Sequence, residues 1–170
     1  LVAKLKKNGV QCLHVGGLGL DAYLTHDSHW RPDTMERVAW QLSELIDLPL
    51  AKTEVVTHSR MVTNGGDLTR EYFEGQEDQE VAIESVEGAQ GSSVFSRQSS
   101  VLLLGDSFTN IYSDADLCWG EKAGFAEHLA KHLEASIDVI AVNGAGASSS
   151  RKRLAQSSGR LAGKKVVFFD

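Results

Sequence analysis

The chain has 170 residues, of which 42% are hydrophobic and 24% charged, and its formal net charge is −6. This composition is typical of a soluble globular domain, and its acidic balance argues against a general binder of nucleic acids or anionic membranes. No apolar run approaches the roughly 18 residues of a membrane-spanning helix, and no signal peptide is visible. We expect one domain over residues 1–170, a fragment truncated at both ends, because the sequence opens without Met and closes in a strand-like run.

Apolar spacing predicts alternating helices and strands in the first half of the chain. The clearest element is a helix over 31–46, where Pro32 suits the first turn and apolar residues recur at helical spacing. The expected elements, in chain order, are a helix at 1–8, a strand at 10–15, a loop at 16–30, the helix at 31–46, a strand at 53–63 and a short helix within 65–75.

The second half continues the alternation after a polar stretch. Residues 74–99 are acidic and then rich in glycine and serine, which indicates a surface excursion in which 81–86 could form a strand. The expected elements after it are a strand at 101–104, a helix at 122–133, a strand at 137–143, a helix at 151–161 and a strand at 165–170. Short apolar strands alternating with helices predict a three-layer α/β fold with a largely parallel central sheet.

A serine stands where the most apolar strand ends. In "VLLLGDSF", Gly105 permits a tight turn, and Ser107 would lie at the carboxyl end of a parallel strand and the start of a helix. Ligands and chemistry concentrate at that edge in α/β proteins. The alternative is that Asp106 or Ser107 only caps the helix.

A serine nucleophile needs a base, usually a histidine held by a carboxylate. "THDSHWRP" contains His26, Asp27 and His29, and in an extended segment Asp27 and His29 leave the same face. Two alternatives remain open: Asp27 or Ser28 caps the following helix, or the two histidines and Asp27 bind a metal.

The remaining histidines offer weaker candidates for the base or for a metal site. His128 and His132 lie four apart on an expected helix, which favours a solvated face. A metal pair there would need further ligands that the sequence does not identify.

These motifs resemble a known family. "LLLGDSF" resembles the nucleophile block of the SGNH (GDSL-type) hydrolase superfamily, and "DSHW" resembles the D-x-H-W motif of its alginate O-acetyltransferase branch. The segments "WGEKAGFAEHLA", "NGAGASSSRKRLA" and "LAGKKVVFF" are similar to that branch too. The order is the most specific feature, because the Asp-His pair precedes the serine, as in this permuted branch.

The resemblance implies a role for each matching residue. Ser107 would be the nucleophile, His29 the general base and acid, and Asp27 its orienting partner. Asn143 and Gly144 follow a strand and are candidates for the oxyanion hole, although the same loop could be a plain strand-to-helix turn.

Other side chains could contact a polymer. Trp30, Tyr112 and Trp119 could stack on sugar rings, and Arg151 could meet a uronate carboxylate. Trp30, which directly follows His29, is the best candidate. However, an aromatic residue beside a catalytic histidine more often packs against the histidine and holds it in place.

The expected activity is the transfer of acetyl groups to hydroxyls of a bacterial exopolysaccharide through acetyl-Ser107, without metal or cofactor. The alternatives are a polysaccharide O-acetylesterase, a catalytically silent carbohydrate-binding module and a metallohydrolase. The resemblance implies a periplasmic or other extracytoplasmic location, a polysaccharide substrate and an acetyl donor, which could be a membrane-bound partner protein. In such a compartment Cys12 and Cys118 could form a disulfide, or they could be two unrelated buried thiols.

Overall fold

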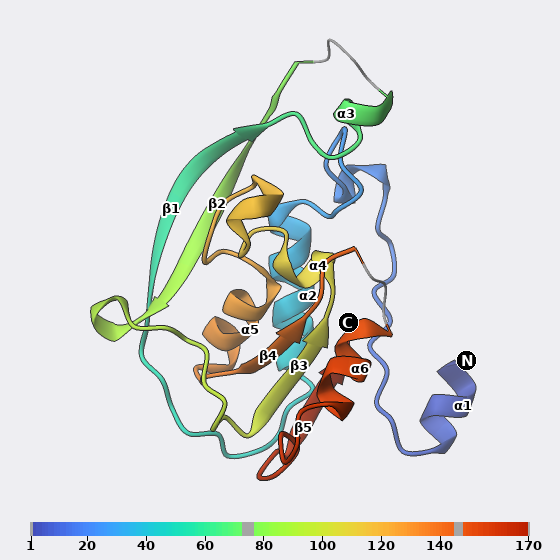
Figure 1. The fold of residues 1–170 in the computed structure, drawn as a ribbon, viewed down its shortest axis with the longest axis vertical. Helices are drawn as coiled ribbons and strands as arrows, with labels where there is room; N and C mark the ends of the chain where they lie inside the picture. The colour runs from blue at the N-terminus through green and yellow to red at the C-terminus, as the bar shows by residue number, and fades with distance from the viewer. Residues whose placement is uncertain (1, 73–76, 145–147, 170) are drawn as a thin grey trace.

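A parallel sheet lies at the centre of the computed structural model, which describes residues 2–72, 77–144 and 148–169 (Figure 1). The strand β3 (Val101–Gly105) pairs on one side with β4 (Asp138–Ala141) and on the other with β5 (Val166–Phe169), both parallel to it. Every residue of β3 is buried, as expected for an apolar strand covered on both faces. The predicted α/β fold with a largely parallel sheet is confirmed.

Helices cover both faces of this sheet. The helices of the described residues are α1 (Val2–Lys7), α2 (Pro32–Ser43), α3 (Thr69–Tyr72), α4 (Ser107–Asn110), α5 (Phe125–Leu133) and α6 (Ser149–Ala155), with short 3₁₀ turns at Leu20–Ala22, Ala89–Gly91 and Ala115–Leu117. Leu102 and Leu104 of β3 pack toward Leu154 of α6, whereas Val101 and Leu103 belong to the main core with α2 and α5. Alternate side chains of one strand thus serve two separate cores.

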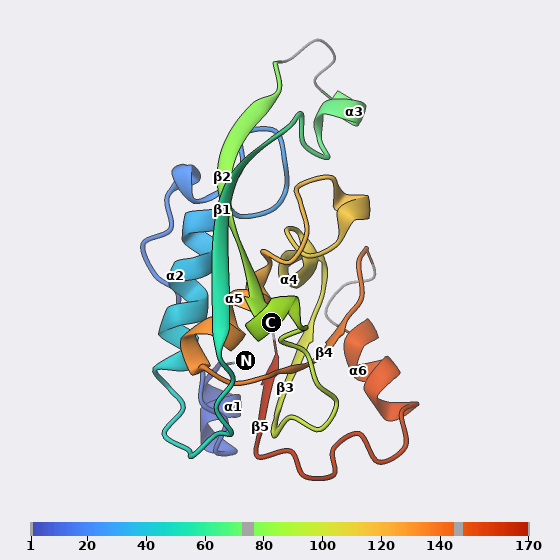
Figure 2. The same cartoon turned by 90° about the vertical axis from the view of Figure 1, so that its left-hand side faces the viewer.

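A long antiparallel hairpin covers the far side of the helix pair (Figure 2). Its strands, β1 (Val55–Asn64) and β2 (Gln79–Gly88), pair along their whole length. Val81, Ile83 and Val86 of β2 are 2–3% exposed and pack into the main core. The possible strand at 81–86 is therefore confirmed as part of β2. The surface excursion expected around it is wrong for residues 79–80 and 87–88, which belong to the same strand.

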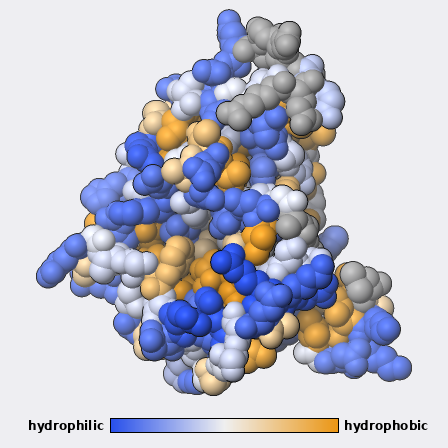
Figure 3. Space-filling model, in the orientation of Figure 1, coloured by the Kyte–Doolittle hydropathy of each residue, from blue (hydrophilic) through white to orange (hydrophobic). Residues whose placement is uncertain are grey.

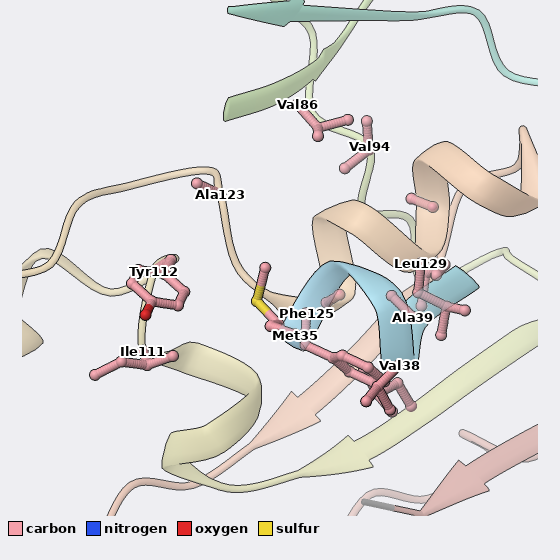
Figure 4. Close-up of a cluster of buried hydrophobic side chains, with 14 of the residues drawn as sticks. Met35, Val38, Ala39, Val86, Val94, Ile111, Tyr112, Ala123, Phe125 and Leu129 are labelled. Carbon is pink, nitrogen blue, oxygen red and sulfur yellow. The ribbon is translucent and has the colours of Figure 1, made fainter. Parts of the chain in front are cut away.

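The main core joins the hairpin, the helices and the sheet. Figure 4 shows Met35 and Val38 of α2 beside Phe125 of α5. Burying a side chain of this size contributes about 1.5–3 kcal/mol. The outer surface is mostly hydrophilic on the face seen in Figure 3, with apolar side chains gathered near its middle.

Several expected elements differ from the structure. Residues 10–15 form no strand, and Leu13 and Val15 instead pack against the core without a pairing partner. The helix expected from residue 122 begins at Phe125, because Lys122 has a positive φ of 59° that no helix allows. The helix expected over 151–161 ends at Ala155.

The two cysteines are not bonded to each other. Cys12 is half-buried and Cys118 exposed, and both are free thiols, so the disulfide considered from the sequence is not formed. Within the described part of the chain, no helix combines the length and the apolar character needed to cross a membrane.

Candidate active site

Ser107 is the first residue of α4, directly beyond the carboxyl end of β3. The capping role belongs to Asp106, whose Oδ1 accepts the Phe108 amide N–H at 2.9 Å. A side chain at Gly105 would place its Cβ 1.9 Å from Thr109 Oγ1, so only glycine lets the helix turn back so tightly. The capping alternative for Ser107 is therefore excluded, and its partly exposed hydroxyl stands at the edge of the sheet where α/β proteins bind ligands.

Asp27 and His29 form a buried pair, 5% and 6% exposed. His29 Nδ1 lies 2.6 Å from Asp27 Oδ1, which also accepts the His29 backbone N–H at 3.0 Å. An ionised carboxylate only accepts hydrogen bonds, so Nδ1 carries the proton and Nε2 is left as the basic nitrogen. This is the orientation of imidazole and carboxylate that a general base needs.

The second carboxylate oxygen of Asp27, Oδ2, accepts two further hydrogen bonds. Asp27 Oδ2 accepts the Trp119 indole N–H at 2.8 Å and the Asp67 amide N–H at 3.0 Å. Burial acts to raise the pKa of Asp27, but the hydrogen bonds from His29, Trp119 and the two amides outweigh it and hold the pKa below its usual value. The carboxylate therefore stays ionised beside the imidazole.

The segment that carries Asp27 and His29 is held in place by backbone hydrogen bonds within the segment. Tyr23 and Trp30 form an antiparallel bridge, and the Leu24 amide donates to the His29 carbonyl at 3.0 Å. Neither Asp27 nor Ser28 caps the next helix, because the N-cap of α2 is Arg31. The capping alternative for the pair is thus wrong.

The loop after β1 also holds this segment in place, through hydrogen bonds to Ser28. Asp67 accepts the Ser28 amide N–H at 2.8 Å and the Ser28 hydroxyl at 2.6 Å. Gly66 lies so close that a Cβ there would be 2.1 Å from the His26 carbonyl oxygen, and its φ is +91°. The sequence alone indicates no role for Gly66 or Asp67, since they lie about 40 residues from Asp27 and His29.

The structure brings the two motifs together. The His29 ring packs on the Phe108 ring with centroids 5.0 Å apart, and the Trp30 indole donates to the Phe108 carbonyl at 3.1 Å. The Ser107 hydroxyl makes no hydrogen bond within the described residues, so the bond to His29 that a serine nucleophile with a histidine base would use is not formed in this structure. Such catalytic bonds often tighten only when substrate binds.

Asn143 lies beside the helix of the serine. Its Oδ1 accepts from Asn110 Nδ2 at 2.8 Å, and its own Nδ2 donates to Asp114 Oδ2 at 2.8 Å. Among the described residues, the second N–H of this amide has no partner. Gly144 is exposed with a φ of +66°, and residues 145–147 lie outside the described residues. Asn110, one turn after Ser107, was missed from the sequence although its helical spacing indicates the same face.

The aromatic candidates for sugar stacking are interior residues. Trp30, Tyr112 and Trp119 are 8%, 0% and 1% exposed. The Tyr112 hydroxyl donates to the Trp30 carbonyl at 2.7 Å. These rings support the site and present no face to a polymer. Arg151 is exposed on α6, with its guanidinium 5.1 Å from the Phe169 ring centroid.

Two groups of described residues could hold a metal ion. One is Asp27, His29 and Asp67; the other is Glu36, His128 and His132. Neither includes His26, so the metal alternative of His26, Asp27 and His29 is not assembled. In the first group, His29 and Asp27 already satisfy each other and Asp67 binds Ser28.

Solved structures share this fold. The chain superposes on the O-acetyltransferase domain of Pseudomonas putida AlgJ with a TM-score of 0.75 and 19% identity, covering 99% of this chain and 61% of that one. For Pseudomonas aeruginosa AlgX the TM-score is 0.72 and the identity 18%, covering 98% of this chain and 40% of that one. The chain thus spans less than two thirds of either protein. No family model and no curated sequence matches it. The likeness shows the fold, an SGNH-like α/β fold.

Proposed function

We propose that this chain is the acyl-transfer domain of an O-acetyltransferase that uses Ser107 as its nucleophile. The observation that carries the proposal is the contact of the buried Asp27–His29 pair with the "GDSF" turn, through the ring contact of His29 with Phe108. A silent binding module has no physical need for an ionised carboxylate that orients an imidazole against the turn that carries a partly exposed serine.

The chemistry proceeds in two halves. His29 Nε2 takes the Ser107 proton as Oγ attacks the acetyl carbonyl, and the same proton then passes to the leaving oxygen, giving acetyl-Ser107. An acceptor hydroxyl loses its proton to His29 and attacks the acetyl group, which restores the Ser107 hydroxyl. The Ser107 amide, at a helix start, and Asn143 would donate to the oxyanion in both halves.

Transfer to a hydroxyl and hydrolysis by water use the same residues. The fold shared with an O-acetyltransferase domain supports transfer, and the motif resemblance supports an alginate-like exopolysaccharide as acceptor. The acceptor would be met outside the cytoplasm, with the acetyl group supplied by a donor that could be a membrane-bound partner protein.

The test is mass spectrometry of the intact protein after exposure to an activated acetyl ester. An adduct of ~42 Da, one acetyl group, should form on Ser107 and be absent from Ser107→Ala. His29→Ala should form it far more slowly, whereas the exposed His58→Ala should match the wild type. An adduct that survives Ser107→Ala would overturn the proposal. Addition of a uronate oligosaccharide then distinguishes transfer from hydrolysis by the ratio of acetylated sugar to free acetate.

A further inference from the structure

His128 and His132 do not lie on the solvated face expected from their spacing. The helix α5 packs against α2, and the side chains of His128 and His132 are 3% and 19% exposed. Glu36 of α2 faces both: its Oε1 is 3.7 Å from His128 Nδ1 and 3.8 Å from His132 Nε2. The potential ligand atoms of the three residues all lie within 4.8 Å of one another.

Both imidazoles turn an unused nitrogen toward Glu36. His128 Nε2 donates to the Glu84 carbonyl at 3.0 Å, and a carbonyl only accepts, so Nδ1 of the same ring has a free lone pair. His128 Nδ1 and His132 Nε2 are buried without a hydrogen-bond partner. Unpaired buried polar atoms are costly, and a metal ligand whose other nitrogen donates to a carbonyl is the usual arrangement in metal sites.

The ligand types suit a divalent cation. Neutral imidazoles and carboxylates are the forms in which histidine and glutamate bind metal ions. Glu36 supplies the carboxylate, and the two histidines supply the imidazoles.

One cation already competes for this carboxylate. Lys131 Nζ donates to Glu36 Oε1 at 2.6 Å and also to Glu84 Oε1. The flexible lysine stem can release Glu36 while it keeps Glu84. Lys131 would therefore set the affinity of the site for a metal ion without being a ligand.

We propose that Glu36, His128 and His132 form a zinc site that ties α2 to α5. Two imidazoles and a carboxylate are a ligand set that zinc accepts, with a fourth position left for water. Zinc–ligand bonds of about 2.0–2.1 Å place tetrahedral ligands roughly 3.3 Å apart. The distances from Glu36 Oε1 to the two imidazoles, 3.7 and 3.8 Å, are near that value. The two imidazole nitrogens lie within 4.8 Å of each other and would move closer together when zinc binds. The site shares no residue with the Asp27–His29 pair, so its role is to stabilise the helix pair.

The experiment is thermal unfolding of the chelator-treated chain with increasing ZnCl₂. Zinc binds the folded protein, so the melting temperature should rise with its concentration. Magnesium should have no effect, because it prefers all-oxygen sites. His132→Ala and Glu36→Gln should lose the rise, whereas His58→Ala should keep it. His132 is the better target because it is less buried than His128 and its loss disturbs the core less.

Lys131→Met tests the competition directly. Removal of the ammonium should tighten zinc binding at least several-fold in a calorimetric titration, whereas a purely structural ion pair predicts no gain. Zinc stabilisation that persists in His132→Ala, or that is lost only in His29→Ala, would overturn the proposal and would place the metal at Asp27, His29 and Asp67 instead. Cobalt in place of zinc should give the visible absorption of a tetrahedral site in the wild type and none in His132→Ala.

Discussion

Trp119 donates its indole N–H to Asp27 Oδ2 at 2.8 Å, across 92 positions of sequence. The bond is buried and occupies the carboxylate oxygen that His29 leaves free. Trp119 therefore holds the Asp27 carboxylate in position and stabilises its negative charge, and Asp27 in turn orients the His29 imidazole.

Trp119→Phe keeps an aromatic ring and removes only the donor. A hydrogen bond to a charged group is worth about 1.5–3 kcal/mol, so kcat for an acetyl ester should fall by roughly tenfold or more. The pKa of Asp27 should rise, because the carboxylate loses one of the hydrogen bonds that lower it. Trp40→Phe, on the exposed face of α2, is the matched control and should change neither. A changed KM with unchanged kcat would mean that Trp119 acts on binding instead.

Asp27→Asn should destabilise the protein in a pH-dependent way. The folded-state pKa of Asp27 is depressed, so its stabilising contribution is present above the ordinary Asp pKa of about 3.9 and is lost as the pH falls through the folded-state pKa. Urea unfolding at neutral pH should show a loss of about 2 kcal/mol relative to the wild type. The difference should shrink below pH ~4, and a difference that stays constant to low pH would contradict an ionised Asp27.

Acetylation of Ser107 should continue in the presence of a strong chelator. The serine supplies its own nucleophile and His29 moves the proton, so no metal-activated water is required. The rate is measured as ester turnover well below the melting temperature, so that a loss of stability is not mistaken for a loss of chemistry. Turnover that stops with chelator and returns with zinc would assign Asp27, His29 and Asp67 to a metal centre.

Glu127→Gln should stabilise the protein at neutral pH. Glu127 is 3% exposed on α5, and burial raises its pKa, although the Ser113 hydroxyl donates to its Oε2 at 2.5 Å. A raised folded-state pKa means that stability falls as the pH rises above the ordinary Glu pKa of about 4.3.

Glutamine accepts the same bond without the charge, so the melting temperature of Glu127→Gln should be about 2–4 °C higher at pH ~8 and equal to that of the wild type near pH ~4. Calorimetry at the two pH values measures this. The exposed Glu134, paired with Lys52, provides the control: Glu134→Gln should give no such gain.

The sequence predicts the local parts of the site well. The apolar run before Gly105 indicates a buried strand, and the two-residue spacing of Asp27 and His29 predicts that they pair. These features depend on neighbours in the chain. Asp67, Trp119 and Asn110 were not predicted as partners, because their contacts join segments that a single sequence does not relate.

The β1–β2 hairpin and the pair His128 and His132 are further cases in which contacts between distant segments could not be predicted. The alternation within 53–63 and the apolar residues of 81–86 each indicate a strand, but the long connection between them has no tight-turn signal, so their pairing could not be predicted. The four-residue spacing of His128 and His132 indicates a shared helix face. Whether that face meets solvent depends on α2 and β2, which pack over it.

The donors to the Asp27 carboxylate arrive from chain positions 40 and 92 residues away. Contacts of such separation form only after large loops have closed, which is slow compared with the growth of helices. During refolding, recovery of the helical signal should therefore precede recovery of acyl transfer. On the ribosome, the carboxylate remains without its indole donor until Trp119 has emerged, so the pair reaches its full activity only after most of the domain has been made.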